Sequence, residues 1–170
     1  MISREDFLQS LLKETRVIRH LFEKIPSDKF DFRPTEKQRS MIELLRYLSV
    51  CGCASMHVIT HGSDWKTQWK PYMDRSADLQ PKDFLAAMDL QDEEMRNMMH
   101  AIPEEDFMNL EVKHPTGDVM TLGIGLVRMP FQWLTAYRFQ LFLYLKQVGI
   151  LDISTTNAWH GRDRTPPVAK

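Results

Sequence analysis

The sequence contains little cysteine, and what it contains is closely spaced. Cys51 and Cys53 are the only two cysteines among the 170 residues. Residues two apart on a helix point to nearly opposite faces, so these thiols cannot readily form a disulfide or clamp one metal ion together. The pattern argues against a secreted disulfide scaffold, and we expect a cytoplasmic protein.

An excess of charge and a long apolar run are also missing. The chain has 22 Lys and Arg against 23 Asp and Glu, interleaved along its length, so no basic surface for nucleic acid is expected. The most apolar region, residues 119–145, is interrupted by Arg128 and Arg138, which argues against a membrane span. The N-terminal residues are polar and lack the apolar core of a signal peptide. We therefore expect neither a nucleic acid nor a membrane as a partner.

Helical periodicity is what the sequence does contain. Apolar residues recur at helical spacing after Ser3 and again after Ser40, and each serine has an acidic residue three positions later, as in a capping box. Pro26 is expected to end the first helix and Gly62 the second.

Two more helices are predicted further along the chain. A third extends from Pro81 to Pro103, and a fourth covers residues 122–148, with Pro130 expected to kink it or to mark its start. Residues 63–80 show no clean period and are predicted to form an aromatic loop over one end of the helices. A turn at residues 114–118 is expected to have short strands on either side.

Four amphipathic helices and one longer crossover connection predict an all-α protein, a four-helix bundle. Residues 1–151 are predicted to form this single domain. Residues 152–170 are predicted to be an irregular tail, with Trp159 as its anchor.

Three stretches resemble a known family. They are residues 31–34 (DFRP), 40–47 (SMIELLRY) and 133–141 (WLTAYRFQL). Together they closely resemble the DinB/YfiT-like metalloenzyme family, and the resemblance extends through Gly149. The resemblance implies a DinB-like four-helix bundle. Because many members of that family are homodimers, it also implies a homodimer here.

The resemblance also implies a metal site. Family members place one histidine late in the second helix and two more as H-x-x-x-H-R-x-Q-L on the fourth. Those histidines bind a divalent metal, often zinc or nickel, and some relatives are similar to thiol S-transferases. In this sequence the three positions hold Tyr47, Trp133 and Tyr137.

The chemistry of these three residues does not suit a metal ion. Trp133 and Tyr137 are four apart and so share a helix face, but an indole nitrogen is only a hydrogen-bond donor. A phenol has a pKa of about 10 and must lose its proton to become a good ligand. We therefore predict no metal and no other cofactor. We expect an aromatic-lined pocket that binds a small molecule, formed by Tyr47, Trp133 and Tyr137 with Cys51 one turn after Tyr47.

Other interpretations of these residues remain. Trp133 and Tyr137 could be ordinary core aromatics, and Cys51 a small buried hydrophobe. The alternative function is a metal-dependent thiol S-transferase or hydrolase with Cys51, His57 or His61 as substitute ligands. A third is a metal-free enzyme in which Tyr47 and Tyr137 donate a proton or stabilise an oxyanion. The sequence does not decide whether the protein is an enzyme.

Overall fold

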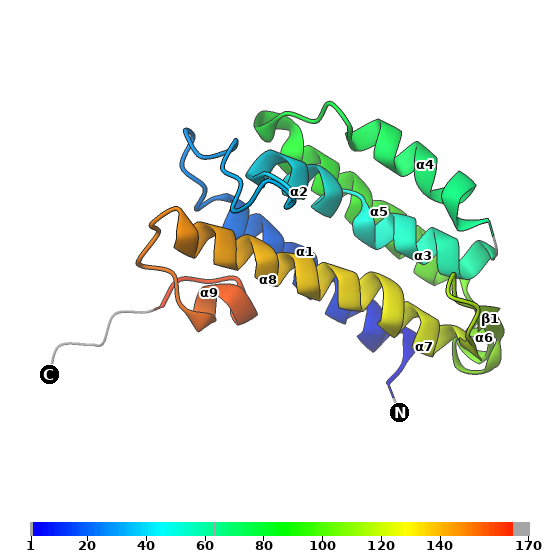
Figure 1. Cartoon of the computed structure of the whole chain (residues 1–170). Helices are drawn as coiled ribbons and strands as arrows, with labels where there is room; N and C mark the ends of the chain where they lie inside the picture. The colour runs from blue at the N-terminus through cyan, green and yellow to red at the C-terminus, as the bar shows by residue number, and fades with distance from the viewer. Residues whose placement is uncertain (1, 63, 165–170) are drawn as a thin grey trace, which may run out of the picture.

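The chain is almost entirely helical (Figure 1). The structure is a computed structural model that describes residues 2–62 and 64–164. Its helices are α1 (Arg4–Phe22), α2 (Met41–Leu48), α3 (Cys51–His61), α4 (Trp65–Ser76), α5 (Phe84–Ala101), α6 (Glu104–Asn109), α7 (Leu122–Leu126), α8 (Gln132–Gln147) and α9 (Thr155–His160). A 3-10 turn (Pro81–Asp83) precedes α5, and a π-helical segment (Val127–Phe131) joins α7 to α8.

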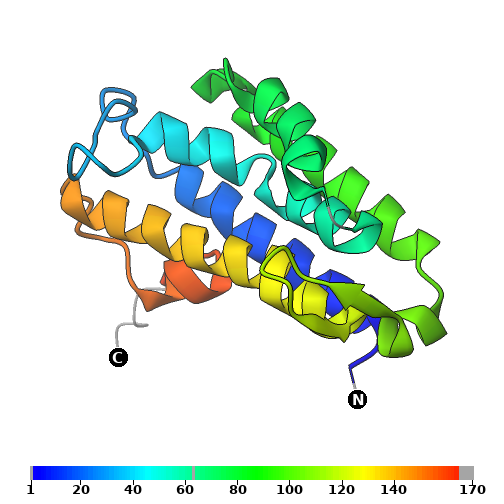
Figure 2. The same cartoon turned by 45° about the vertical axis from the view of Figure 1, so that its right-hand side comes forward.

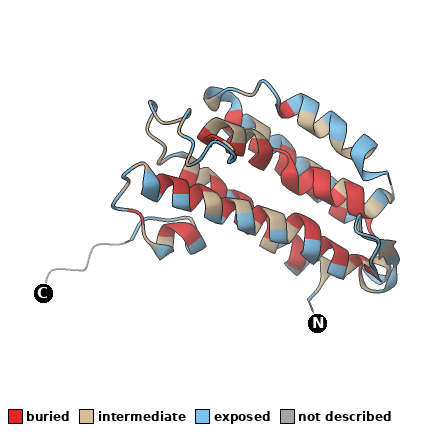
Figure 3. Ribbon diagram, viewed as in Figure 1, coloured by how far each residue is buried: buried red, intermediate tan, exposed pale blue. Residues whose placement is uncertain are grey.

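Four helical rods form the bundle: α1, α2 with α3, α5, and α7 with α8. Helix α1 packs against α5 and α8, while α3 packs against α5 and the π-helical segment. Helix α4 runs back along the outside, so α2–α3 and α5 point the same way (Figures 1 and 2). Buried residues line the faces that the rods turn toward one another (Figure 3). The all-α fold expected from the sequence is confirmed.

The ends of the elements follow the predicted signals. Ser3 and Ser40 each form a capping box with the acidic residue three positions later. Pro130 lies inside the π-helical segment, where a wider turn accommodates a residue that has no N–H. Strands β1 (Glu111–Lys113) and β2 (Val119–Thr121) pair antiparallel as a short hairpin at one end of the bundle.

The predicted single helix over residues 40–62 is in fact two helices. Helices α2 and α3 meet at a bend of 42°. The side-chain amide of Gln91 on α5 lies in the break, accepting from the Gly52 N–H (2.8 Å) and donating to the Leu48 carbonyl (3.0 Å). These two backbone groups would bond each other in a continuous helix. An inserted side chain is a known cause of a helix bend.

Gly52 permits this insertion. A Cβ at Gly52 would lie 2.9 Å from the Met95 sulfur and 3.1 Å from the Gln91 side-chain oxygen. Both distances are shorter than comfortable contacts, so a larger residue would displace the buried amide. The break therefore depends on a small residue on α3 and a polar residue on α5.

The loop predicted for residues 63–80 is wrong for most of its length, because residues 65–76 form α4. Asp64 caps this helix by accepting from the Thr67 N–H (3.4 Å). Most of α4 is exposed (Figure 3), so its polar residues obscure the helical period. Trp69, Tyr72 and Met73, at helical spacing, pack against the core.

The predicted irregular tail also contains a helix, α9, which begins at a capping box formed by Ser154 and Asn157. Arg138 on α8 is buried, forms an ion pair with the buried Glu14 on α1, and donates to the Ala158 carbonyl. The Trp159 ring lies 5.1 Å from the Arg138 guanidinium carbon. A buried arginine thus holds α9 in place. Residues 165–170 of the predicted tail lie outside the described residues.

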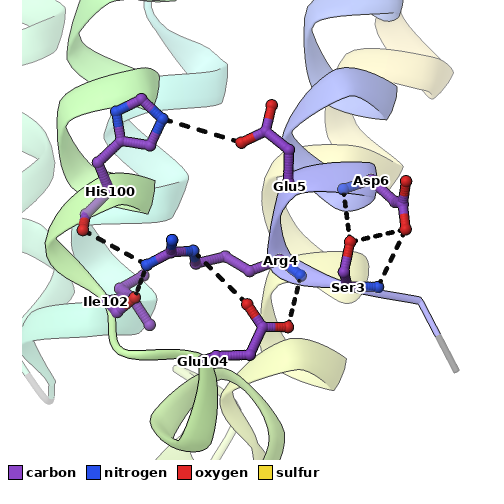
Figure 4. Close-up of polar contacts among 7 residues, drawn as sticks. All are labelled: Ser3, Arg4, Glu5, Asp6, His100, Ile102 and Glu104. Carbon is purple, nitrogen blue, oxygen red and sulfur yellow. Dashed lines mark hydrogen bonds and ion pairs between the residues drawn. The ribbon is translucent and has the colours of Figure 1, made fainter.

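Arg4 joins α1 to the last turn of α5, at the end of the bundle far from α2 (Figures 1 and 4). Its guanidinium donates to the carbonyls of His100 and Ile102, and its backbone N–H donates to Glu104 (3.0 Å). A cation at a helix C-terminus satisfies free carbonyls and complements the helix dipole. These contacts of Arg4 stabilise the packing of the start of α1 against the end of α5.

None of the described helices is by itself long and apolar enough to cross a membrane. The bent pair α2 and α3 meets the length and composition criteria when taken together.

Candidate functional site

The structure brings the three predicted aromatic residues into one cluster. The rings of Tyr47 on α2 and Tyr137 on α8 meet edge to face, with centroids 4.6 Å apart. Trp69 of α4 lies between Tyr47 (6.0 Å) and Trp133 (5.3 Å), and so completes a chain of four rings. Such tilted and edge-to-face pairs are favourable contacts. We call these four residues the aromatic cluster.

Trp69 was not foreseen as part of this group. Its segment was predicted to be a loop, which gave no basis for placing its ring beside Tyr47. The spacing of Trp65, Trp69, Tyr72 and Met73 is helical and was the available signal.

Arg39 is the second residue that sequence reasoning missed. Its guanidinium carbon lies 4.2 Å from the Tyr47 ring centroid and 5.5 Å from that of Tyr137. An arginine at this distance over a ring is attracted by the ring's quadrupole and can stack on it. The cluster is therefore covered on one side by a cation.

The backbone of Arg39 is fixed from α8. The Tyr144 hydroxyl donates to the Arg39 carbonyl (2.8 Å), and the Gln140 amide donates to the Tyr144 oxygen (2.7 Å). Gln140 belongs to the stretch that carries the family resemblance. Here it supports the position of Arg39 through Tyr144.

The Tyr47 hydroxyl and the adjoining Cys51 thiol are held in their neutral forms. Burial raises the pKa of Tyr47, and neighbouring Cys51 and Tyr137 raise it further. Burial raises the pKa of the Cys51 thiol to about 12. Neither group is thus a ready anionic ligand at neutral pH. The indole of Trp133 has no lone pair to offer a metal ion. The side chains at this site therefore do not fit a divalent metal ion.

The substitute ligands do not gather around one point. His57 and His61 stack on each other on α3, with ring centroids 4.2 Å apart, whereas Cys51 is enclosed in the core. Across residues 2–62 and 64–164, no three His, Cys, Asp or Glu side chains lie where they could hold one ion. The alternative of a metalloenzyme with substitute ligands lacks a ligand set in this part of the chain.

A groove opens beside Tyr47, between α2 and the end of α4. Its volume is about 460 Å³. Its walls combine apolar surface with charged groups, and we call it the Arg39 groove. It is lined by Arg39, Glu43, Arg46, Tyr47, Met73, Asp74, Ser76 and Ala77.

Comparison with known proteins identifies the fold. Neither a protein-family model nor a curated protein matches the sequence. Two solved structures are similar. A protein assigned to the DinB family from Exiguobacterium sibiricum 255-15 has a TM-score of 0.68 at 18% identity, over 89% of this chain and 94% of that one. A DinB-like protein from Bacillus subtilis has a TM-score of 0.63 at 19% identity, over 84% and 92%. The chain has a DinB-like fold.

Proposed function

We propose that this protein binds a small molecule in the Arg39 groove without the help of a metal ion. One observation carries the proposal: where the resemblance places three metal ligands, the side chains are rings in a connected cluster, and one of them, Tyr47, lines an open groove. On this view the positions that hold metal ligands in the family hold aromatic residues here, and they support the binding of a small molecule instead.

The groove suits a small ligand. Its volume lies within the usual range for small-molecule sites, about 300–1,000 Å³. Tyr47 lines the groove on the α2 side, and Met73 on the opposite helix offers an adaptable apolar contact. The polar groups at the rim would fix the orientation of the ligand.

We also propose that the protein is cytoplasmic and forms a homodimer. Phe139 and Leu143 lie four apart on α8 and are about two-fifths exposed, and the half-exposed Trp159 stacks on Phe139 at 6.3 Å. A second copy of the chain could cover this apolar surface. Sedimentation equilibrium should find a dimer, and Phe139→Glu should shift it toward the monomer. A wild-type protein that sediments as a monomer would contradict this proposal.

Metal independence can be tested by titrating tag-free protein with Zn²⁺ and Ni²⁺ in a calorimeter. We expect no tight one-to-one binding. His57→Ala serves as the control, because weak binding to the stacked histidines should disappear in that variant. Tight binding that survives His57→Ala and is lost in Tyr47→Phe would overturn the proposal.

Occupancy of the groove can be tested with a panel of small aromatic and aliphatic fragments, observed by amide chemical shifts. Bound fragments should shift the signals of Tyr47 and Met73. Ala77→Trp should block them, since Ala77 lines the groove, whereas Ala86→Trp, on the exposed face of α5, should not. Fragments that bind equally well to both variants would show that the ligand site lies elsewhere.

A further inference from the structure

The Arg39 groove holds an arginine whose charge is not neutralised by a carboxylate. The Arg39 guanidinium carbon lies 4.2 Å from the Tyr47 ring centroid and 5.5 Å from that of Tyr137, and the described residues give the guanidinium no ion pair and no side-chain hydrogen bond. A guanidinium carries five N–H donors and no acceptor. These donors therefore have no carboxylate partner within the described residues, and an acceptor in the groove would supply one.

A second arginine lines the same groove. Arg46 uses its Nε–H to donate to the Leu79 carbonyl (3.1 Å), and no other hydrogen bond or ion pair of its guanidinium is found within residues 2–62 and 64–164. Its contact with Leu79 fixes the side chain at the groove wall and leaves its terminal nitrogens unused. Two arginines without a carboxylate partner among the described residues thus line one groove.

The two carboxylates on the groove wall have cations of their own. Glu43 accepts from the Ser40 N–H (2.7 Å) and pairs with Arg33 (2.8 Å), and Asp74 pairs with Lys70. Neither forms an ion pair with Arg39 or Arg46 among the described residues. Both groove arginines can therefore exchange their hydrating water for an anionic ligand.

The remaining walls are apolar or neutral. Tyr47 keeps its proton at neutral pH and so adds no negative charge to the groove, and Met73 and Ala77 offer apolar contact. A guanidinium binds a carboxylate through two parallel hydrogen bonds, which suits a ligand with a planar charged end. The groove lining thus offers both guanidinium donors for such a group and apolar side chains for the body of the ligand.

We propose that the ligand of the Arg39 groove is a small organic carboxylate, with its anionic end on Arg39 and Arg46 and its apolar body against Tyr47 and Met73. This inference rests on the proposed function and adds the chemical class of the ligand.

The test uses three probes and isothermal titration calorimetry on the full chain. Benzoate has both a carboxylate and an apolar body, benzyl alcohol has a similar body without charge, and inorganic phosphate has charge without the body. We expect benzoate to bind at least about tenfold more tightly than the other two. Its affinity should fall several-fold when salt is raised from 50 to 300 mM.

Variants locate the interaction. Arg39→Gln should weaken benzoate binding about tenfold, and Arg46→Gln should weaken it several-fold, with little change for benzyl alcohol. Arg16→Gln, an exposed arginine on α1 outside the groove, is the matched control and should bind benzoate like the wild type. Arg46→Gln also tests the proposal if Arg39→Gln does not fold.

Each contrary result has a distinct meaning. Equal binding of benzoate and benzyl alcohol, both blocked by Ala77→Trp, would overturn the carboxylate assignment and leave the small-molecule site standing. Tighter binding of phosphate than of benzoate would overturn the proposal that the ligand has an apolar organic body. No binding of any probe would overturn the carboxylate proposal, while tight metal binding that depends on Tyr47 would overturn the proposed function itself.

Discussion

Arg138 and Arg39 are two arginines of the same bundle in opposite circumstances. Arg138 is only 1% exposed, pairs with Glu14, donates to the Ala158 carbonyl and lies under Trp159. Arg39 stacks on two tyrosine rings at the edge of a groove and has no carboxylate partner among the described residues. Both touch aromatic rings, but only one has its charge matched by the protein.

The difference separates structural charge from charge available for binding. A buried guanidinium must have its charge and its N–H groups compensated within the fold, and Arg138 does this while fixing α9. A partly exposed guanidinium remains hydrated and needs no internal partner, so it can exchange water for a ligand. The comparison predicts that Arg138 matters for stability and that Arg39 matters for binding.

The largest effect is expected for Arg138→Met. It leaves Glu14 buried without a partner, so we expect the free energy of unfolding to fall by about 3–5 kcal/mol, measured by urea denaturation. Combining it with Glu14→Gln should recover a large part of the loss, because no buried charge is then left unpaired. A loss below about 1 kcal/mol in the single variant would remove the contrast between the two arginines.

The next largest loss of stability is expected at the break between α2 and α3, which follows Tyr47 in the chain. Gln91→Leu leaves the Leu48 carbonyl and the Gly52 N–H without their partner, so we expect a loss of about 2–3 kcal/mol in the same assay. Gln9→Leu is the matched control. Its side chain donates to Glu5 on the surface of α1, and its change should stay within about 0.5 kcal/mol. Equal stabilities for the two variants would mean that α2 and α3 join into one helix without strain.

A small effect on stability is expected for Arg39→Gln. Loss of the stacking on Tyr47 and Tyr137 should cost about 0.5–1 kcal/mol by urea denaturation. The same variant should lose most of its affinity for benzoate, so stability and binding respond differently at this position. A loss as large as that of Arg138→Met would show that Arg39 is a structural residue.

The smallest effect is expected from pH. Burial, and then the nearby His61, lower the pKa of His57, so the unfolded chain binds a proton there more readily than the folded chain. Stability from this group is present above the unfolded pKa of about 6.5 and is lost as pH falls through that value toward the lower folded pKa. His57→Gln should make the decline in thermal midpoint between pH 7.5 and pH 5 slightly shallower. An identical decline in the variant and the wild type would contradict this assignment.

Most of the bundle could be predicted because its signals are local. Capping serines, prolines and apolar spacing act within one or two turns of helix, and they placed the main rods. The break between α2 and α3 could not be predicted, because it depends on Gln91, some forty residues later in the chain. Helix α4 was missed since its exposed polar face weakens the period.

The candidate site was predictable only in part. The four-residue spacing of Trp133 and Tyr137 placed both on α8, and the resemblance brought Tyr47 toward them. Trp69 and Arg39 come from segments without a recognised motif, and their positions depend on tertiary packing. Arg46 lies in the stretch that carries the resemblance, but nothing in the sequence showed that it and Arg39 line one groove, and this pair decides the class of ligand that we propose.

The inserted amide of Gln91 has a consequence for the dynamics of the bundle. The Gly52 N–H is held by a side chain of another helix, so local fraying of α3 cannot by itself release it for exchange with solvent deuterium. Its exchange should require α5 to move away from α3, an opening close to global unfolding. This single amide would therefore report how often the two central rods separate.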